Sequence, residues 1–244
     1  MKILLVVPGP LDDEGAARRR AEIPNELLGA DTAVDCIPVK RAIAVSSDRD
    51  ATFLAAFITE AALRAEDEGY DAVVVDSVFD PGLYPLRSRL SIPVIGPGLA
   101  AYTTAITLGK RFSILSLGEP ARRYQRTLDL YDLEDKCASI RTARPTGGED
   151  GLLEGLTAEA RQAIDDDGAD VIVLGSTTMR QASQHLASRL PCPVIDPGAV
   201  ALKMAEKIVL LGLSHSKGVF PSPKRLQDDK FEEYLPLVSP PHGH

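Results

Sequence analysis

An internal repeat constrains the fold of this chain more than any other feature of its 244 residues. The segment EDEGYDAVVVDS at 66–77 matches DDDGADVIVLGS at 165–176, and LSIPVIGPGLA at 90–100 matches LPCPVIDPGAV at 190–200. Equivalent positions lie 99 residues apart in the first pair and 100 apart in the second. This constant spacing predicts two similar structural units related by a pseudo-two-fold axis. All parallel α/β units share some likeness, but the common Pro-Val-Ile-x-Pro-Gly stretch is more specific than that.

The order of the expected elements indicates the fold class. Continuous apolar, β-branched runs are typical of parallel strands covered on both faces, and they occupy 2–7, 70–76, 111–117 and 169–175. Helical spacing of apolar residues covers 50–69, which Gly69 is expected to end, and 199–213. We therefore expect an α/β protein of two pseudo-symmetric three-layer α/β/α units with parallel sheets.

The repeat also suggests where the units begin and end. We expect residues 1–100 together with 202–244 to form the first unit and residues 101–201 to form the second. In open parallel sheets, ligands bind outside the carboxyl ends of the strands. The strand tips of the two units are therefore the first places to look for a functional site.

Composition excludes several classes of partner. The net charge of −8 argues against nucleic acid, and no apolar stretch approaches the roughly 20 residues that cross a bilayer. The three cysteines Cys36, Cys137 and Cys192 are odd in number and lack CxxC spacing, which favours a cytoplasmic protein with reduced thiols. The chain has four histidines, and Asp196 is the one carboxylate beside the Pro-rich turn of the second repeat, so a metal site is improbable.

Each repeat places a serine just beyond a buried strand, Ser77 after AVVVD and Ser176 after IVLG. Backbone N–H groups and hydroxyl donors at such tips suit a carboxylate or an enolate-like oxyanion. The alternative is ordinary capping of the following helix by serine or threonine. On the first reading, Ser77 and Ser176 are catalytic, and the turn residues contact substrate: Val78, Phe79, Thr177 and Thr178.

Chemistry at these tips needs a base and a group that neutralises substrate charge. His215, in the loop LGLSHSKG, is the best generic base, although a loop histidine without catalytic function is an equal alternative. Asp76 precedes Ser77 but points to the opposite face of a strand, and Asp80 is expected to be a turn or capping residue. Arg180 could bind a substrate carboxylate. Ser116, which follows RFSIL (111–115), could contact ligand.

The chain resembles the aspartate/glutamate/hydantoin racemase superfamily, and hydantoin racemases most of all. The resemblance covers nearly the whole chain and rests on FDPGL (79–83), LGKRFSIL (108–115), DKCASIR (135–141), DGADVIVLGSTTM (167–179), PVIDPGAVALKMAE (193–206) and LGLSHSKGVFPSP (211–223). It implies two α/β domains with an active site in the cleft between them, no cofactor, and a small carboxylate or cyclic amide as substrate. Racemases of this family use two cysteines, one in each half, to remove and return a proton.

The chain departs from this pattern at the two decisive positions. The family cysteines fall at Ser77 and Ser176, and none of the three real cysteines replaces them. A natural serine branch explains this better than deliberate replacement of both cysteines. Serine needs a separate base, so the two-thiol mechanism does not simply transfer. We expect a cofactor-independent racemase or isomerase. The alternatives are a decarboxylase, hydrolase or lyase using serine, and a non-catalytic carboxylate-binding protein. We also expect a homo-oligomer, with FEEYLPLV (231–238) at a subunit contact.

Overall fold

The computed structural model describes residues 1–9, 11–144, 148–230 and 233. Residue contacts divide the chain into two compact units. The first comprises Met1–Asp76, Pro81–Ile95 and the chain from Leu202 onward, and the second comprises Ser77–Asp80 and Gly96–Ala201. The turn that carries Ser77 is therefore grouped with the unit that carries Ser176.

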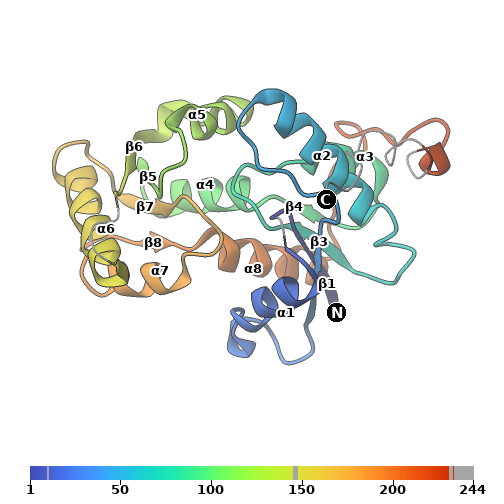
Figure 1. Cartoon of the computed structure of the whole chain (residues 1–244), viewed down its shortest axis with the longest axis horizontal. Coiled ribbons are helices and arrows are strands. Elements are labelled where there is room, and N and C mark those ends of the chain that lie inside the picture. Colours follow the sequence, from blue (N-terminus) through green and yellow to red (C-terminus); the bar gives the residue numbers. More distant parts are fainter. Residues whose placement is uncertain (10, 145–147, 231–232, 234–244) are drawn as a thin grey trace, which may run out of the picture. The chain divides into compact units, whose positions relative to one another are not determined.

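Each unit contains a four-stranded sheet in which all pairings are parallel (Figure 1). The sheet of the first unit has the order β2-β1-β3-β4 and consists of β1 (Lys2–Val7), β2 (Ala33–Pro38), β3 (Ala72–Val75) and β4 (Val94–Ile95). The sheet of the second has the order β6-β5-β7-β8 and consists of β5 (Phe112–Ser116), β6 (Cys137–Thr142), β7 (Val171–Leu174) and β8 (Val194–Ile195). The identical strand orders confirm the α/β class and the two similar units predicted from the repeat.

Helices connect the strands, as the alternation in the sequence predicted. The first unit contains α1 (Asp13–Ala21), α2 (Asp48–Ala62) and α3 (Leu83–Arg89), and the second contains α4 (Pro97–Leu108), α5 (Ala121–Leu130), α6 (Gly148–Asp165) and α7 (Arg180–Ala187). The last helix, α8 (Pro197–Leu210), begins in the second unit and continues in the first. Two short 3₁₀ turns occupy Asn25–Leu27 and Glu134–Lys136.

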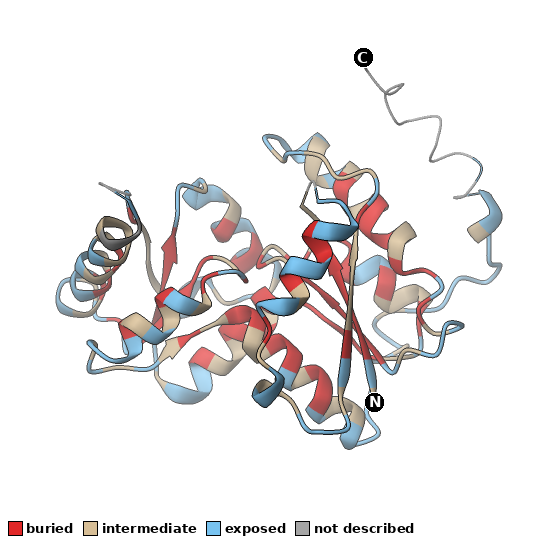
Figure 2. Cartoon of the chain, turned by 60° about the horizontal axis from the view of Figure 1, so that its bottom comes forward, coloured by how far each residue is buried: buried red, intermediate tan, exposed pale blue. Residues whose placement is uncertain are grey.

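The second unit shows why its strands are continuous apolar runs. Ile114 and Val173 face a core formed with α4 and α5, whereas Leu115 and Leu174 face a second core formed with α6 and α7. Successive side chains of a strand point to opposite faces, so a sheet covered on both faces buries every residue. Figure 2 shows these central strands as buried.

Two helix ends differ from the sequence prediction. The helix expected over 50–69 ends at Ala62, and residues 63–69 form turns in which Leu63 and Ala65 donate to carbonyls three residues earlier. These hydrogen bonds to the third residue back, in place of the fourth, end the α-helix before Gly69. Gly69, with a φ of +80°, ends the turns that follow the helix. The helix expected over 199–213 runs from Pro197 to Leu210 and stops two residues before Gly212, where φ is +63°.

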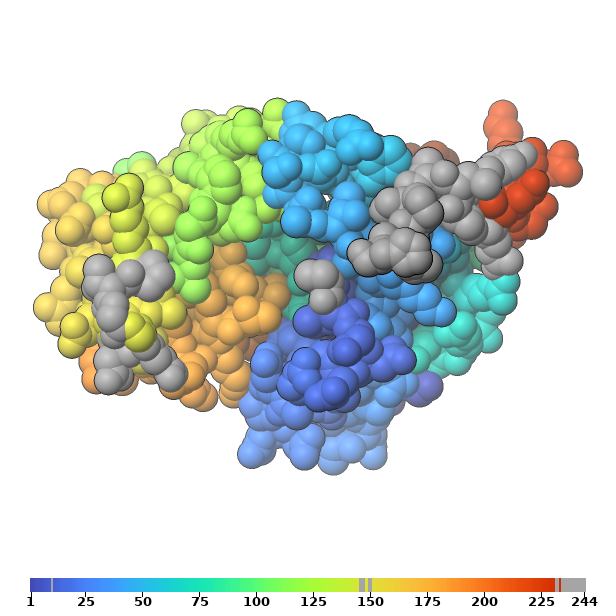
Figure 3. Space-filling model, in the orientation of Figure 1, coloured from blue at the N-terminus to red at the C-terminus, as the bar shows by residue number. Residues whose placement is uncertain are grey.

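The described end of the chain lies at the surface. Residues 221–227 are exposed, as the red atoms in Figure 3 show, and Asp228 is tied to Arg89 by an ion pair of 2.8 Å. The proposed subunit contact FEEYLPLV lies almost entirely outside the described residues. None of the described helices has the length and apolar character needed to cross a bilayer.

Candidate functional site

The two serine turns have the same geometry. Ser77 follows the end of β3 by two residues, and Ser176 follows the end of β7 by two residues. The Ser77 Oγ accepts a hydrogen bond from the N–H of Phe79 at 3.3 Å, and the Ser176 Oγ accepts one from the N–H of Thr178 at 3.3 Å. Both serines are half-buried. The repeat therefore builds the same serine-containing turn twice.

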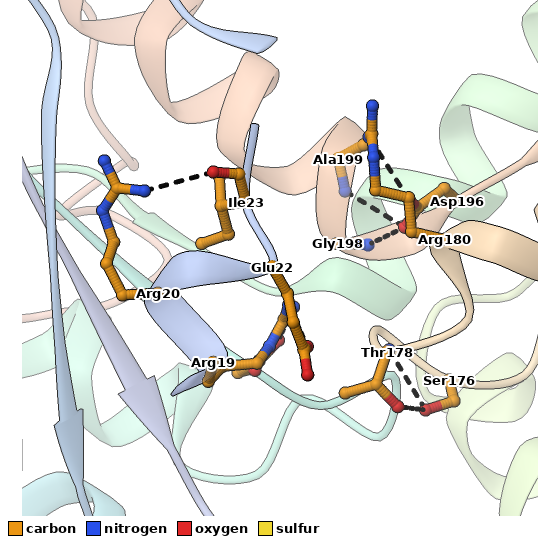
Figure 4. A network of polar contacts seen from close by, with 11 residues as sticks. Arg19, Arg20, Glu22, Ile23, Ser176, Thr178, Arg180, Asp196, Gly198 and Ala199 are labelled. Carbon is orange, nitrogen blue, oxygen red and sulfur yellow. Dashed lines mark hydrogen bonds and ion pairs between the residues drawn. The ribbon is translucent and has the colours of Figure 1, made fainter. Parts of the chain in front are cut away.

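The two serine hydroxyls contact groups of their own turns. Each oxygen accepts from its own turn, which leaves the Ser77 hydroxyl hydrogen free to donate. The Ser176 oxygen also lies 3.1 Å from the Thr178 hydroxyl, as Figure 4 shows. The contacts given for the two serine oxygens come from their own turns. A hydroxyl held in this way can donate a hydrogen bond to a carbonyl or carboxylate oxygen.

The residue before each serine is held by a buried group, and the two groups differ. Asp76, before Ser77, accepts two hydrogen bonds from Arg19, from Nε at 2.6 Å and from Nη2 at 3.1 Å. Gly175, before Ser176, accepts one from the Tyr124 hydroxyl at 2.9 Å. Both side chains of the Arg19–Asp76 pair are more than 90% buried. This ion pair holds the Asp76 carboxylate against the guanidinium of Arg19.

The third residue of each turn also differs. Phe79 packs its ring against Tyr124, with centroids 4.9 Å apart, and the Arg123 guanidinium lies 3.9 Å from the centre of the same ring. The equivalent residue, Thr178, is exposed and offers a hydroxyl. One turn therefore presents an aromatic side chain and the other a polar one.

Three of the predicted substrate-binding side chains lie inside the protein. Val78 is 4% exposed and belongs to the hydrophobic core of the second unit, and Thr177, at the equivalent position, is 5% exposed. Ser116 has no exposed surface, and its hydroxyl donates to the carbonyl of Glu119 at 3.1 Å. Val78 and Thr177 are the middle residues of their turns and are buried, and Ser116 is buried at the end of β5.

Asp80 acts as a cap, as the sequence suggested. Its carboxylate accepts hydrogen bonds from the N–H groups of Gly98 and Leu99, both at 2.8 Å, at the first turn of α4. The Tyr131 hydroxyl donates to the same carboxylate at 2.6 Å. Asp80 thereby satisfies N–H groups that have no partner within the helix. Its φ of +48° is the left-handed conformation that aspartate tolerates better than most residues.

The second repeat caps its helix from a different position. Asp196 accepts from the N–H groups of Gly198 and Ala199, at 3.0 and 3.2 Å. Arg180, the first residue of α7, lies 4.0 Å from this carboxylate, and Figure 4 shows the two side chains together. The guanidinium is only partly exposed, and its charge is partly compensated by Asp196. Arg180 therefore remains a predicted substrate-binding residue, but not an isolated cation.

His215, the predicted base, contacts the loop before β4. Its Nε2 lies 2.9 Å from the carbonyl oxygen of Leu90, which precedes β4 and so lies at the amino end of the first sheet. Ser77 follows the carboxyl end of β3, which runs parallel to β4. The length of a strand therefore separates the two ends of the sheet. Burial, together with the nearby Lys217 charge, lowers the pKa of His215.

The native cysteines do not replace the missing thiols. Cys36, Cys137 and Cys192 are free and half-buried, in β2, at the start of β6 and just before β8. Burial raises the pKa of Cys36 and of Cys137 to about 11, and it raises the pKa of Cys192 as well. Within the described ranges, no group of three or more histidines, cysteines and carboxylates could hold a metal ion.

Reasoning from the sequence missed the residues that support the turns, namely Arg19, Tyr124 and Tyr131. One signal was present, because the aligned repeats place Asp76 opposite Gly175, and a buried charge needs a partner where a glycine does not. The partners themselves lie 57 and 51 residues away, on helices or helix ends whose positions the repeat does not specify.

Comparisons with known proteins agree with the two-unit architecture. The family described as Asp/Glu/Hydantoin racemase matches residues 20–205. A hydantoin racemase from Paenarthrobacter aurescens is 31% identical over 227 residues, which span 89% of this chain and 94% of that protein. Allantoin racemase from Klebsiella pneumoniae has a TM-score of 0.81 at 26% identity, covering 93% of this chain and 95% of that one. Allantoin racemase from Pseudomonas fluorescens has the same score and identity, covering 93% and 99%.

Proposed function

The chain belongs to the Asp/Glu/hydantoin racemase family, and from this premise we propose that it is a cofactor-independent racemase of a hydantoin-like cyclic amide. The similar proteins are named for hydantoin and allantoin, which are both five-membered cyclic ureides. A cyclic amide also suits the turns better than a carboxylate does. Their donors are neutral hydroxyls, and the charge of Arg180 is partly compensated by Asp196.

The observation that carries the proposal is the duplicated serine turn. In racemisation the proton of the carbon beside a carbonyl passes to a base while the electron pair moves onto the carbonyl oxygen, and a proton then returns to the opposite face. With serine hydroxyls acting as donors to that oxygen, we propose that solvent water accepts the proton and returns one from the opposite face. Hydrogen-bond donors stabilise the charge that develops on that oxygen. The Ser77 Oγ accepts from the N–H of Phe79 and the Ser176 Oγ accepts from the N–H of Thr178, so each hydroxyl hydrogen can point out of its turn, which supports this role.

Serine is a weaker proton acceptor than the thiolate of the family mechanism. The thiol pKa of about 8.5 lies several units below that of an alcohol, and each unit corresponds to about 1.4 kcal/mol. We therefore expect slow turnover by the natural chain. Restoring thiols at Ser77 and Ser176 should raise the rate by about 100-fold or more, because a thiol can be tuned to a thiolate near neutral pH.

The test is proton exchange in D₂O. Single enantiomers of 5-methylhydantoin and of allantoin are incubated with the wild type, with Ser77→Cys/Ser176→Cys and with Ser77→Ala/Ser176→Ala, and deuterium incorporation and optical rotation are followed. Faster exchange with loss of optical rotation in the cysteine variant, and loss of exchange in the alanine variant, supports a racemase. Absence of exchange in all three variants contradicts the proposal.

A second candidate is a non-catalytic binding protein for a carboxylate or cyclic amide, and it is favoured by serine hydroxyls whose given contacts are with groups of their own turns. Calorimetry with the same compounds separates the two candidates, because tight binding without exchange indicates a binding protein. The hydrolase alternative would need a base for one serine, and the contacts of Asp76 with Arg19 and of His215 with Leu90 do not favour either residue for that role. New products in the NMR spectra would instead indicate a decarboxylase or lyase.

A further inference from the structure

One buried side chain in the second unit contacts both serine turns. Tyr124 has no exposed surface; its ring packs against Phe79 of the first turn, and its hydroxyl donates to the Gly175 carbonyl of the second. Burial raises the pKa of Tyr124, and a hydrogen bond with the Ser116 side chain acts in the opposite direction. With its pKa above the usual value of about 10, the phenol keeps its proton at neutral pH and remains a donor.

The Tyr124 hydroxyl fixes the peptide unit that leads into Ser176. The Gly175 carbonyl and the Ser176 N–H belong to one planar trans peptide, so they point in opposite directions. Holding the carbonyl oxygen at 2.9 Å from Tyr124 therefore directs the Ser176 N–H away from the core. The approach is close, since a Cβ on Gly175 would lie 2.6 Å from the Tyr124 oxygen and 2.7 Å from the Leu115 carbonyl oxygen.

The first turn has no equivalent dependence on this hydroxyl. The residue before Ser77 is Asp76, which Arg19 holds by two hydrogen bonds. The contact between Tyr124 and Phe79 uses only the aromatic rings. Removing the hydroxyl while keeping the ring should therefore disturb the Ser176 turn and leave the Ser77 turn in place.

We propose that Tyr124 is a positioning residue for Ser176 and not for Ser77, so that the two turns are set by separate anchors. This inference rests on the proposed function for its catalytic meaning, since Ser176 matters to turnover only if the turns bind substrate. The geometric part concerns the turn alone and can be measured without substrate.

The experiment places a thiol reporter in each turn. Ser176→Cys and Ser77→Cys are made separately in the wild-type, Tyr124→Phe and Tyr102→Phe backgrounds, and alkylation by iodoacetamide is followed by peptide mass from pH 6 to pH 10. Tyr124→Phe should shift the pKa of the Ser176→Cys thiol by about half a unit and slow its reaction at pH 7 by about threefold, because donors of the turn stabilise the thiolate. The Ser77→Cys thiol should change by less than about 1.5-fold in rate.

Tyr102→Phe is the matched control. Tyr102 lies in the same core, and its buried hydroxyl is one of two buried side-chain polar atoms without a hydrogen-bond partner among the described residues. Its loss removes a phenol oxygen without breaking a hydrogen bond. Three results would overturn the proposal. The pKa and alkylation rate of the Ser176→Cys thiol could be unchanged by Tyr124→Phe, they could change equally in both turns, or Tyr102→Phe could change them by the same amount. Absence of deuterium exchange in every variant counts against the proposed function alone.

Discussion

The carboxylate of Asp80 occupies the space that a side chain at Gly96 would need. A Cβ on Gly96 would lie 2.4 Å from the Asp80 Cγ and 2.6 Å from its Oδ2. In the other repeat, the residue equivalent to Gly96 is Asp196, which caps its own helix. The two repeats thus solve the same problem, unsatisfied N–H groups at the start of α4 and α8, with a carboxylate from different positions.

This relationship predicts strong coupling between Asp80 and Gly96. Asp80→Ala removes two hydrogen bonds to α4 and one from Tyr131, and it should lower the free energy of unfolding by about 2–4 kcal/mol. Gly96→Ala should cost about 1–3 kcal/mol alone, because Asp80 must move. In the Asp80→Ala background the same change should cost at least about 1 kcal/mol less. Urea unfolding of the wild type, the two single variants and the double variant measures the free energies of this double-mutant cycle. If the two single effects add, the predicted coupling is wrong.

The Arg19–Asp76 pair predicts a large loss of stability when one partner is removed. Arg19→Met or Asp76→Asn breaks this buried ion pair, at a cost of about 3–5 kcal/mol. The double variant Arg19→Met/Asp76→Leu should recover part of that loss. The neighbouring Arg18 is the control, since its exposed pair with Glu14 should contribute about 1 kcal/mol or less. Similar losses for Arg18→Met and Arg19→Met would contradict the prediction.

The contacts of Glu206 predict that the stability of the fold decreases at acid pH. The Lys203 ion pair is the main cause of its lowered pKa of about 2, and hydrogen bonds from the Thr32 hydroxyl and the Gly29 N–H also lower it. The folded pKa lies below the unfolded value of about 4.3, so the stabilising contribution is present above that value and is lost as the pH falls toward 2. Urea unfolding at pH 6 and pH 3 should therefore show a smaller acid-induced loss of stability for Glu206→Gln than for the wild type.

The native thiols should react slowly in the folded protein. Because burial raises the pKa of Cys36 and Cys137 to about 11, few thiolates form at pH 8, and alkylation should be about 100-fold slower than in denaturant. Replacing all three cysteines by serine should leave any deuterium exchange unchanged. Loss of exchange in that triple variant would show that a native cysteine takes part in the chemistry.

The α/β class, the duplicated unit and the position of both serine turns could be predicted from the sequence. The reason is that these features are local: continuous apolar runs specify buried strands, and a repeat with constant spacing carries the same turn to the same place. Asp80 was recognisable as a turn or capping residue on the same local grounds. The resemblance to racemases rested on motifs of this kind.

The residues that support each turn, and the side chains that face inward, are known from the folded structure and not from the sequence pattern. Tyr124 and Gly175 are 51 residues apart, and Arg19 and Asp76 are 57 apart, so no local pattern joins them. The same lack of a local pattern explains why four predicted site residues lie where the sequence analysis did not expect them. Ser116, Val78 and Thr177 are buried by contacts from other elements, and His215 lies at the amino end of a sheet because its loop returns to Leu90. Burial and hydrogen bonding depend on segments that are distant in the sequence. The positions of those segments are determined by how the elements pack and not by spacing along the chain.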